Sequence, residues 1–148
     1  MEARHRVGRV QYWLLKSEPS GWSFASQRAK APQSEEWSGV RNAQARNFMA
    51  QMQLGDLAFF YHTESERAIV GIVQVTATAH ADSTADDPKW VCVDVRAHQA
   101  LMRPVTLAQL KADGRFADMP LLRQPRLSVQ PVSQMHWDWI CAMGGLPQ

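Results

Sequence analysis

Three strand-like segments follow one another in the middle of the chain with no helix between them, and this order most constrains the fold. They cover residues 56–63, which are apolar on both faces, residues 68–79, which are rich in β-branched side chains, and residues 90–98. A doubly wound sheet needs a helix between successive parallel strands, so the order argues against that class. We expect an α+β fold with a small, curved, mixed β-barrel and flanking helices.

Two details within these segments favour curvature. Gly71 interrupts the long central segment, and a glycine inside a strand marks a bulge or a sharp bend. Val91, Val93 and Val95 alternate with polar neighbours, which indicates a strand with one face on the core. The pattern therefore predicts a closed or nearly closed barrel. Two shorter strands are expected near the ends of the chain, at residues 10–16 and 126–132.

Capping residues predict where the helices begin. Asn42 is a good N-cap for a helix that reaches about residue 53. Thr106 and Gln109 form a capping-box pattern for a short helix, and Ser133 precedes a final helix that stops at Gly144. A further short helix is expected at residues 23–31.

The composition suits one domain, expected at residues 10–146, behind a flexible basic tail at residues 1–9. The formal net charge is +2, which is compatible with an anionic partner. No stretch has the length of a membrane-spanning helix, so no membrane partner is expected. Cys92 and Cys141 lack metal-like spacing and are interpreted as buried, reduced thiols in a cytoplasmic protein.

The chain is rich in tryptophan, and four of its tryptophans lie beside turns or polar groups rather than in apolar runs. They are Trp13, Trp22, Trp37 and Trp90. Aromatic rings interleaved with lysine and arginine can stack a nucleobase and hold its phosphate. The alternative is that these rings only cover the core, which is the role expected of the tryptophans in the final helix.

The segment "KSEP" places Lys16, Ser17 and Glu18 at the end of a strand. Donors and acceptors of this kind can read the edge of a base, although a plain surface turn has the same composition. Arg41 and Arg46 lie around the start of the helix expected at Asn42, where positive charge opposes the helix dipole. Either a bound phosphate or a carboxylate such as Glu18 or Glu36 would offset that charge.

Catalytic motifs are weak. The residues His62 and Glu64 match half of a zinc deaminase signature, but the P-C-x-x-C half is absent. A metal site that also includes Glu66 is possible but weakly supported by the sequence. The chain contains no P-loop, dinucleotide fingerprint or obvious nucleophile–base pair. The sequence therefore favours a binding protein over an enzyme.

Several motifs together resemble the EVE domain family. They include "KSEP", "GVRNAQARNFM", "GDLAFFYHT", "DDPKW" and "LSVQPV", and the resemblance extends from about Tyr12 to about Gly145. It implies a PUA-like fold, related to PUA, YTH and ASCH domains, that reads a modified, unstacked base in DNA or RNA without a cofactor. The alternatives are an enzyme acting on a modified nucleotide or flipped base, and a peptide-binding adaptor.

The resemblance also implies which residues bind the ligand. They are Trp13, Lys16, Ser17, Glu18, Trp22, Trp37, Gly39, Val40, Arg41, Asn42, Arg46, Asn47, Tyr61, His62 and Ser128. Trp37 is the best candidate for stacking a base, and Ser17 and Glu18 are the candidates for reading its edge. The loop before Trp90 is shorter than in many relatives, which is expected to leave the pocket more open.

Overall fold

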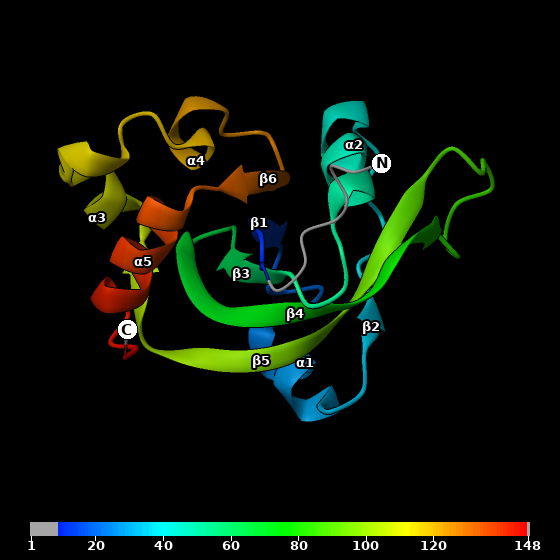
Figure 1. Cartoon of the computed structure of the whole chain (residues 1–148), viewed down its shortest axis with the longest axis horizontal. Coiled ribbons are helices and arrows are strands. Elements are labelled where there is room, and N and C mark those ends of the chain that lie inside the picture. The colour runs from blue at the N-terminus through cyan, green and yellow to red at the C-terminus, as the bar shows by residue number, and fades with distance from the viewer. Residues whose placement is uncertain (1–8, 148) are drawn as a thin grey trace.

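A computed structural model describes residues 9–147, so the predicted basic tail lies, except for Arg9, outside the described residues. A six-stranded mixed sheet forms the centre of the molecule, in the strand order β2-β5-β4-β3-β1-β6 (Figure 1). The strands are β1 (Tyr12–Ser17), β2 (Glu35–Glu36), β3 (Leu57–His62), β4 (Ala68–Ala81), β5 (Val91–Thr106) and β6 (Val129–Val132).

The three segments that follow one another in sequence form the antiparallel meander β3-β4-β5. Strand β1 runs parallel to β3 and antiparallel to β6. The predicted α+β class, with a curved mixed sheet and flanking helices, is confirmed. The expected closure of the sheet into a barrel is not observed, because the strand order ends at β2 and β6, which do not pair with each other. Both edge strands are short, so they offer few backbone groups to each other.

The sheet bends at Gly71, as its position inside a strand predicted. The register shifts between Ile69 and Gly71 in the β4–β5 pair, and between Phe60 and Tyr61 in the β3–β4 pair. A Cβ atom at Gly71 would lie 2.3 Å from the ring of Phe24. Glycine is therefore required at this position because the first helix packs a phenylalanine directly on the strand backbone.

Three helices begin at the capping residues expected from the sequence, and a fourth, α1, lies within the expected range 23–31. They are α1 (Phe24–Lys30) after Ser23, α2 (Ala43–Gln51) after Asn42, α3 (Leu107–Ala112) after Thr106, and α5 (Gln134–Met143) after Ser133. The short elements η2 (Gly114–Phe116) and α4 (Pro120–Arg123) were not expected, and β5 continues past residue 98. Within residues 9–147, no helix combines the length and apolar character needed to cross a bilayer.

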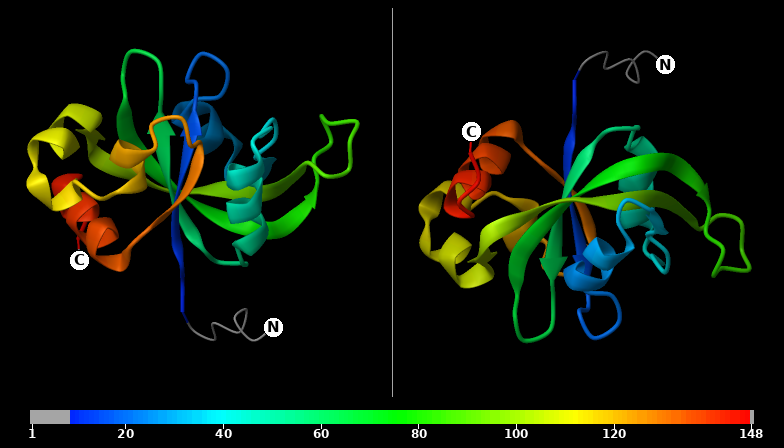
Figure 2. Two further views of the ribbon diagram at one scale, coloured as in Figure 1. Left: turned by 90° about the horizontal axis from the view of Figure 1, so that it is seen from above. Right: turned by 90° about the horizontal axis from the view of Figure 1, so that it is seen from below.

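Two hydrophobic cores lie on opposite faces of the sheet, because alternate residues of a strand point to opposite faces. Leu15 and Phe60 belong to one core, whereas Leu14 and Phe59 belong to the other. We call the first face, covered by α1 and α2, the pocket side, and the second, covered by α3, α4 and α5, the helical side. Figure 2 shows α3, α4 and α5 together at one end of the molecule and α1 and α2 nearer its middle.

Both cysteines are free and buried, as the sequence predicted. Cys92 lies on β5 and Cys141 lies on α5.

Candidate functional site

A pocket of about 590 Å³ lies where β1 ends, on the pocket side of the sheet. Its walls come from the end of β1, the turn that follows, β2 with the loop after it, and the segment before β6. Its volume falls within the range of about 300–1,000 Å³ that is typical of small-molecule sites. The lining residues are Lys16, Ser17, Glu18, Gly21, Trp22, Glu35, Glu36, Trp37, Ser38, Gly39, Val40, Arg41 and Ser128.

The end of β1 is tied to the segment before β6. The backbone N–H of Lys16 donates to the carbonyl of Ser128 at 2.9 Å, and its ammonium group donates to the carbonyl of Pro125 at 2.6 Å. Burial lowers the pKa of Lys16 from its ordinary value. The hydroxyl of Ser17 donates to the carbonyl of Trp22 at 2.5 Å, which fixes the turn between them. The predicted edge-reading segment is therefore held rigidly at the pocket wall.

Two tryptophans line the pocket with different degrees of burial. Trp37 is only 6% exposed and packs edge-on against Phe60, with ring centroids 5.2 Å apart. Trp22 is partly exposed, and its indole Nε1 donates to the side chain of the buried Gln27 at 2.8 Å. Trp37 thus backs the wall as part of the core, whereas Trp22 leaves more of its ring available to a ligand.

The rim at Gly39 and Arg41 is organised by Asp82, a buried carboxylate that reaches over from the end of β4. Gly39 has a φ of +86° and donates its N–H to Asp82 at 2.8 Å. The guanidinium of Arg41 donates to Asp82 at 3.1 Å and to the hydroxyl of Thr84 at 3.1 Å. The charge of Arg41 is therefore balanced by Asp82 and not by Glu18 or Glu36, the two carboxylates considered from the sequence.

Asp82 is held in its ionised form. Burial alone would raise the pKa of this carboxyl group, but hydrogen bonds from Thr84, from the backbone of Gly39 and from Arg41 outweigh burial and lower the pKa to about 2. A permanently charged Asp82 keeps Arg41 and the Gly39 backbone fixed at the pocket rim.

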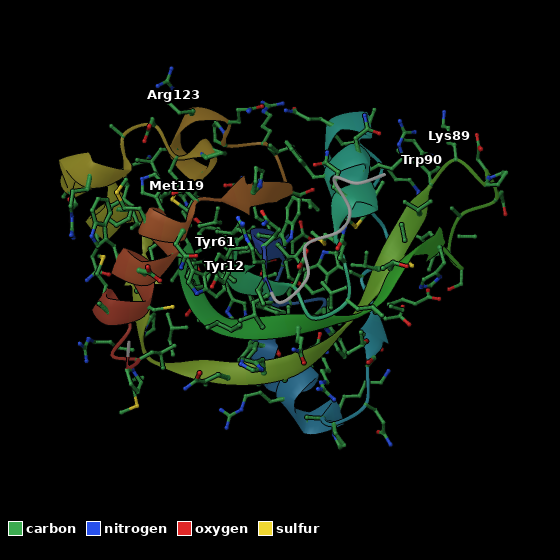
Figure 3. All side chains as sticks on the ribbon, in the orientation of Figure 1. Tyr12, Tyr61, Lys89, Trp90, Met119 and Arg123 are labelled. Atoms are coloured by element: carbon green, nitrogen blue, oxygen red, sulfur yellow. The ribbon has the colours of Figure 1, made fainter. Side chains whose placement is uncertain are left out.

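Helix α2 places its predicted residues outside the pocket lining. Asn42 caps the helix by accepting from the N–H of Ala45 at 2.9 Å. Arg46 donates to Asn47 at 3.2 Å and lies 5.4 Å from the ring centroid of Trp90. The ammonium of Lys89 is also 5.0 Å from the centroid of the Trp90 ring, and Figure 3 shows Lys89 and Trp90 at the loop that joins β4 to β5. Within residues 9–147, no carboxylate pairs with Arg46.

Trp13 and Tyr61 lie inside the protein rather than at the pocket surface. Trp13 is buried in the core of the pocket side, and its indole donates to Asp56 at 3.0 Å. Tyr61 is buried beneath Lys16, whose ammonium is 5.8 Å from the ring centroid. Tyr61 therefore supports Lys16 from the helical-side core, whereas Trp13 is part of the pocket-side core.

His62 also has a supporting position. One ring nitrogen accepts from the N–H of Phe24 at 3.0 Å, and the other bonds to Glu66 at 2.7 Å. Glu64 turns away and accepts from Ser20. The structure therefore does not assemble the weak His62–Glu64–Glu66 metal site.

Sequence reasoning missed several pocket residues, namely Gly21, Glu35, Glu36, Ser38 and the rim carboxylate Asp82. Glu35 and Glu36 form the edge strand β2, which faces the end of β1 only after the sheet has curved. No local pattern in the sequence predicts that β2 and the end of β1 line the same pocket. The pocket thus combines three carboxylates, a lysine and an arginine with its tryptophans.

The fold is PUA-like. The structure resembles an ASCH protein from Zymomonas mobilis, with a TM-score of 0.57 over 90% of this chain and 95% of that chain, at 14% identity, which supports the fold alone. A family model, the EVE domain, matches residues 11–143. The chain belongs to the EVE domain family.

Closer relatives agree with this assignment. A protein from Agrobacterium tumefaciens has a TM-score of 0.90 and 50% identity, covering 93% of this chain and 94% of that chain. Thymocyte nuclear protein 1 of Mus musculus is 35% identical, over 89% of this chain and 73% of its own length. A structure of human THYN1 in complex with 5-methylcytosine-containing DNA has a TM-score of 0.84 and 32% identity, covering 93% of this chain and 99% of that chain.

Proposed function

We propose that residues 10–146 act as a single nucleic-acid-binding module that takes a modified, unstacked base into the pocket. The observation that carries this proposal is the pocket itself, where Trp22 and Trp37 lie beside Lys16, Glu18 and Glu36. Stacking on an aromatic ring is worth about 1–3 kcal/mol per base. The charged groups in the same wall can read the polar edge of the base.

The carboxylates suggest which base edge the pocket accepts. A carboxylate accepts a hydrogen bond from an exocyclic amine, such as the N4 amine of cytosine. Glu18 lines the pocket and is suited to that role. The DNA bound by human THYN1 carries 5-methylcytosine, so this base is the first ligand to test.

The phosphate backbone is proposed to follow the outer face of α2 and the β4–β5 hairpin. Arg46 and Lys89 present positive charge there, over the ring of Trp90. Because Arg46 has no carboxylate partner within the described residues, a phosphate can neutralise it. Arg41 is already paired with Asp82 and is assigned a role in holding the pocket rim.

We propose binding without turnover. An acyl- or group-transfer enzyme needs a nucleophile beside a general base. The pocket hydroxyl of Ser17 instead donates to the carbonyl of Trp22 at 2.5 Å and is committed to the turn. A cytoplasmic location remains a prediction, which cell fractionation would test.

The proposal is tested by fluorescence anisotropy with oligonucleotides that are identical except at one cytosine, in single-stranded DNA, duplex DNA and RNA. We expect tighter binding when that cytosine carries the 5-methyl group. Mass spectrometry of the recovered oligonucleotide should show an unchanged base. Equal affinity for modified and unmodified forms in all three contexts would contradict base reading, and a chemically altered base would contradict binding without turnover.

A further inference from the structure

Four side chains of types that bind transition metals come together behind the pocket wall, from three adjacent strands. Glu36 lies on β2, His80 on β4, and Cys92 and Asp94 on β5. Strand pairing brings them together, because Glu36 lies opposite Asp94 and His80 lies opposite Cys92. One ligand atom from each of the four side chains lies within 4.8 Å of the others.

The imidazole of His80 is oriented as metal-binding histidines usually are. Its Nδ1 lies 3.2 Å from the carbonyl oxygen of Ala81, to which it can donate. Its Nε2 lies 2.8 Å from a carboxylate oxygen of Asp94. Nε2 and this carboxylate therefore face each other as a hydrogen-bonded pair, and a metal ion would replace that hydrogen bond by binding to both. Metal-bound histidines commonly donate their other ring N–H to a backbone carbonyl.

The thiol of Cys92 completes the cluster. Its Sγ lies 3.8 Å from Nε2 and 3.9 Å from Nδ1 of His80, so the sulfur lies over the face of the ring, and a change of side-chain rotamer would bring it onto an ion bound at Nε2. Cys92 is fully buried, and its nearest oxygen contact is weak, at 4.0 Å from the carbonyl of Ala81. Glu36 is oriented by the hydroxyl of Ser83, which donates to it at 2.6 Å.

We propose that Glu36, His80, Cys92 and Asp94 bind a divalent transition-metal ion of the zinc class. Magnesium and calcium prefer sites made only of oxygen ligands, whereas thiolate and imidazole together select zinc and similar ions. Four protein ligands leave no open coordination position, so the ion has a structural role. It ties the two-residue strand β2 to the β4–β5 hairpin, and Glu36 places it directly behind the pocket wall.

Metal titration of the purified full chain tests this site independently of any nucleic acid. The protein is treated with a chelator and then titrated with Zn²⁺ by calorimetry, and with Co²⁺ by absorption spectroscopy. We expect about one ion per chain, a thiolate-to-cobalt charge-transfer band, and a higher melting temperature with Zn²⁺. The Cys92→Ser variant should lose the band. The matched variant Cys141→Ser, which removes the other buried thiol, should keep it.

A second pair of variants keeps the test decisive if Cys92→Ser does not fold. His80 is partly exposed, so His80→Gln should fold and should lose the increase in melting temperature with Zn²⁺. His98→Gln, at an exposed position of β5, should respond as the wild type does. No zinc binding by the wild type, or binding that survives His80→Gln unchanged, would overturn the proposal. The His80–Asp94 pair would then be held by a proton alone.

Discussion

The helical side and the pocket side each place an arginine over a tryptophan ring, but they differ in what neutralises the arginine. On the helical side, Arg115 lies 4.6 Å from the ring centroid of Trp139, and Asp113 accepts from its guanidinium at 2.8 Å. On the pocket side, Arg46 lies over Trp90 without a carboxylate partner among residues 9–147. The charge of Arg115 is therefore neutralised by a carboxylate, whereas the charge of Arg46 is available to an anion.

Trp137 on the helical side and Trp22 on the pocket side differ in how far other rings cover them. Trp137 is stacked between Tyr12 and Phe59, with centroid distances of 4.3 and 3.9 Å, and is 5% exposed. Trp22, in the pocket, is partly exposed. Rings with neighbours on both faces stabilise the fold, whereas a ring with an open face can accept a base. The surroundings of a tryptophan or arginine side chain, and not its type, therefore decide whether it stabilises the fold or is available to a ligand.

Removing Trp137 should have the largest effect on stability. The Trp137→Ala variant loses both stacked contacts and leaves a cavity, so we expect a loss of about 3–5 kcal/mol in the free energy of unfolding. Urea denaturation measures the loss. The fraction that stays folded should bind oligonucleotides with wild-type affinity, because the helical side lies away from the pocket. A Trp137→Ala variant that is stable but binds weakly would contradict the assignment of Trp137 to stability alone.

Neutralising Asp82 should affect both stability and the pocket rim. The folded-state pKa of Asp82 is about 2, below its ordinary value of 3.8, so its ionisation stabilises the fold by roughly 2 kcal/mol at neutral pH. A lowered folded-state pKa gives a contribution that is complete above about pH 4 and is lost as pH falls towards 2. Asp82→Asn should remove this contribution and loosen Gly39 and Arg41.

Unfolding curves at several pH values test the role of Asp82. The difference in unfolding free energy between wild type and Asp82→Asn should be largest near pH 7 and should shrink between about pH 4 and 2. A difference that does not change with pH would mean that the charge of Asp82 contributes nothing to stability.

Removing Trp22 should weaken binding more than folding. Trp22→Ala takes away the exposed stacking surface, which is worth about 1–3 kcal/mol of affinity. Its melting temperature should fall much less than that of Trp137→Ala, since Trp22 is only partly buried. Anisotropy titrations and thermal melts on the same samples separate the two effects. Wild-type affinity in a folded Trp22→Ala variant would remove this ring from the proposed site.

Removing the charge of Arg46 should have the smallest effect on affinity, and that effect should appear in the salt dependence of binding. If its charge meets a phosphate, Arg46→Ala should lower the slope of log affinity against log salt concentration by about one unit. Arg123 is an exposed arginine on α4, at the far end of the molecule in Figure 3, and Arg123→Ala is the matched control. The control should keep the wild-type slope. Equal losses in both variants would indicate an effect of net charge rather than a defined contact.

Local sequence signals predicted the elements of this fold well, because capping residues and alternation act over a few neighbouring positions. Asn42, Thr106 and Ser133 each cap a helix, and Gly71 marks the bend. Openness of the barrel was not predictable, because it depends on how far the short edge strands β2 and β6 reach once the sheet has curved.

The pocket was only partly predictable for the same reason. The segments at Lys16 and Gly39 carry recognisable motifs, and the structure brings both to the pocket wall. Asp82 and Glu36 come from segments without a motif, and only long-range strand pairing places them there. Trp13 carries an aromatic signal similar to that of Trp22, but it points into the core, where Asp56 binds its indole. Whether a tryptophan ring is buried depends on how the strands pair and pack, which the sequence around the tryptophan does not show.

Entry of a modified base into the pocket beside Trp22 is tested by the ratio of dissociation constants for unmodified and 5-methylcytosine oligonucleotides. The ratio is measured for wild type, Trp22→Ala and Arg46→Ala under one salt condition. We expect a ratio above one for wild type and a ratio close to one for Trp22→Ala. For Arg46→Ala we expect the wild-type ratio at lower overall affinity, because phosphate contacts carry no base information. A wild-type ratio of one, or a ratio that Trp22→Ala leaves unchanged, would contradict entry of the modified base beside Trp22.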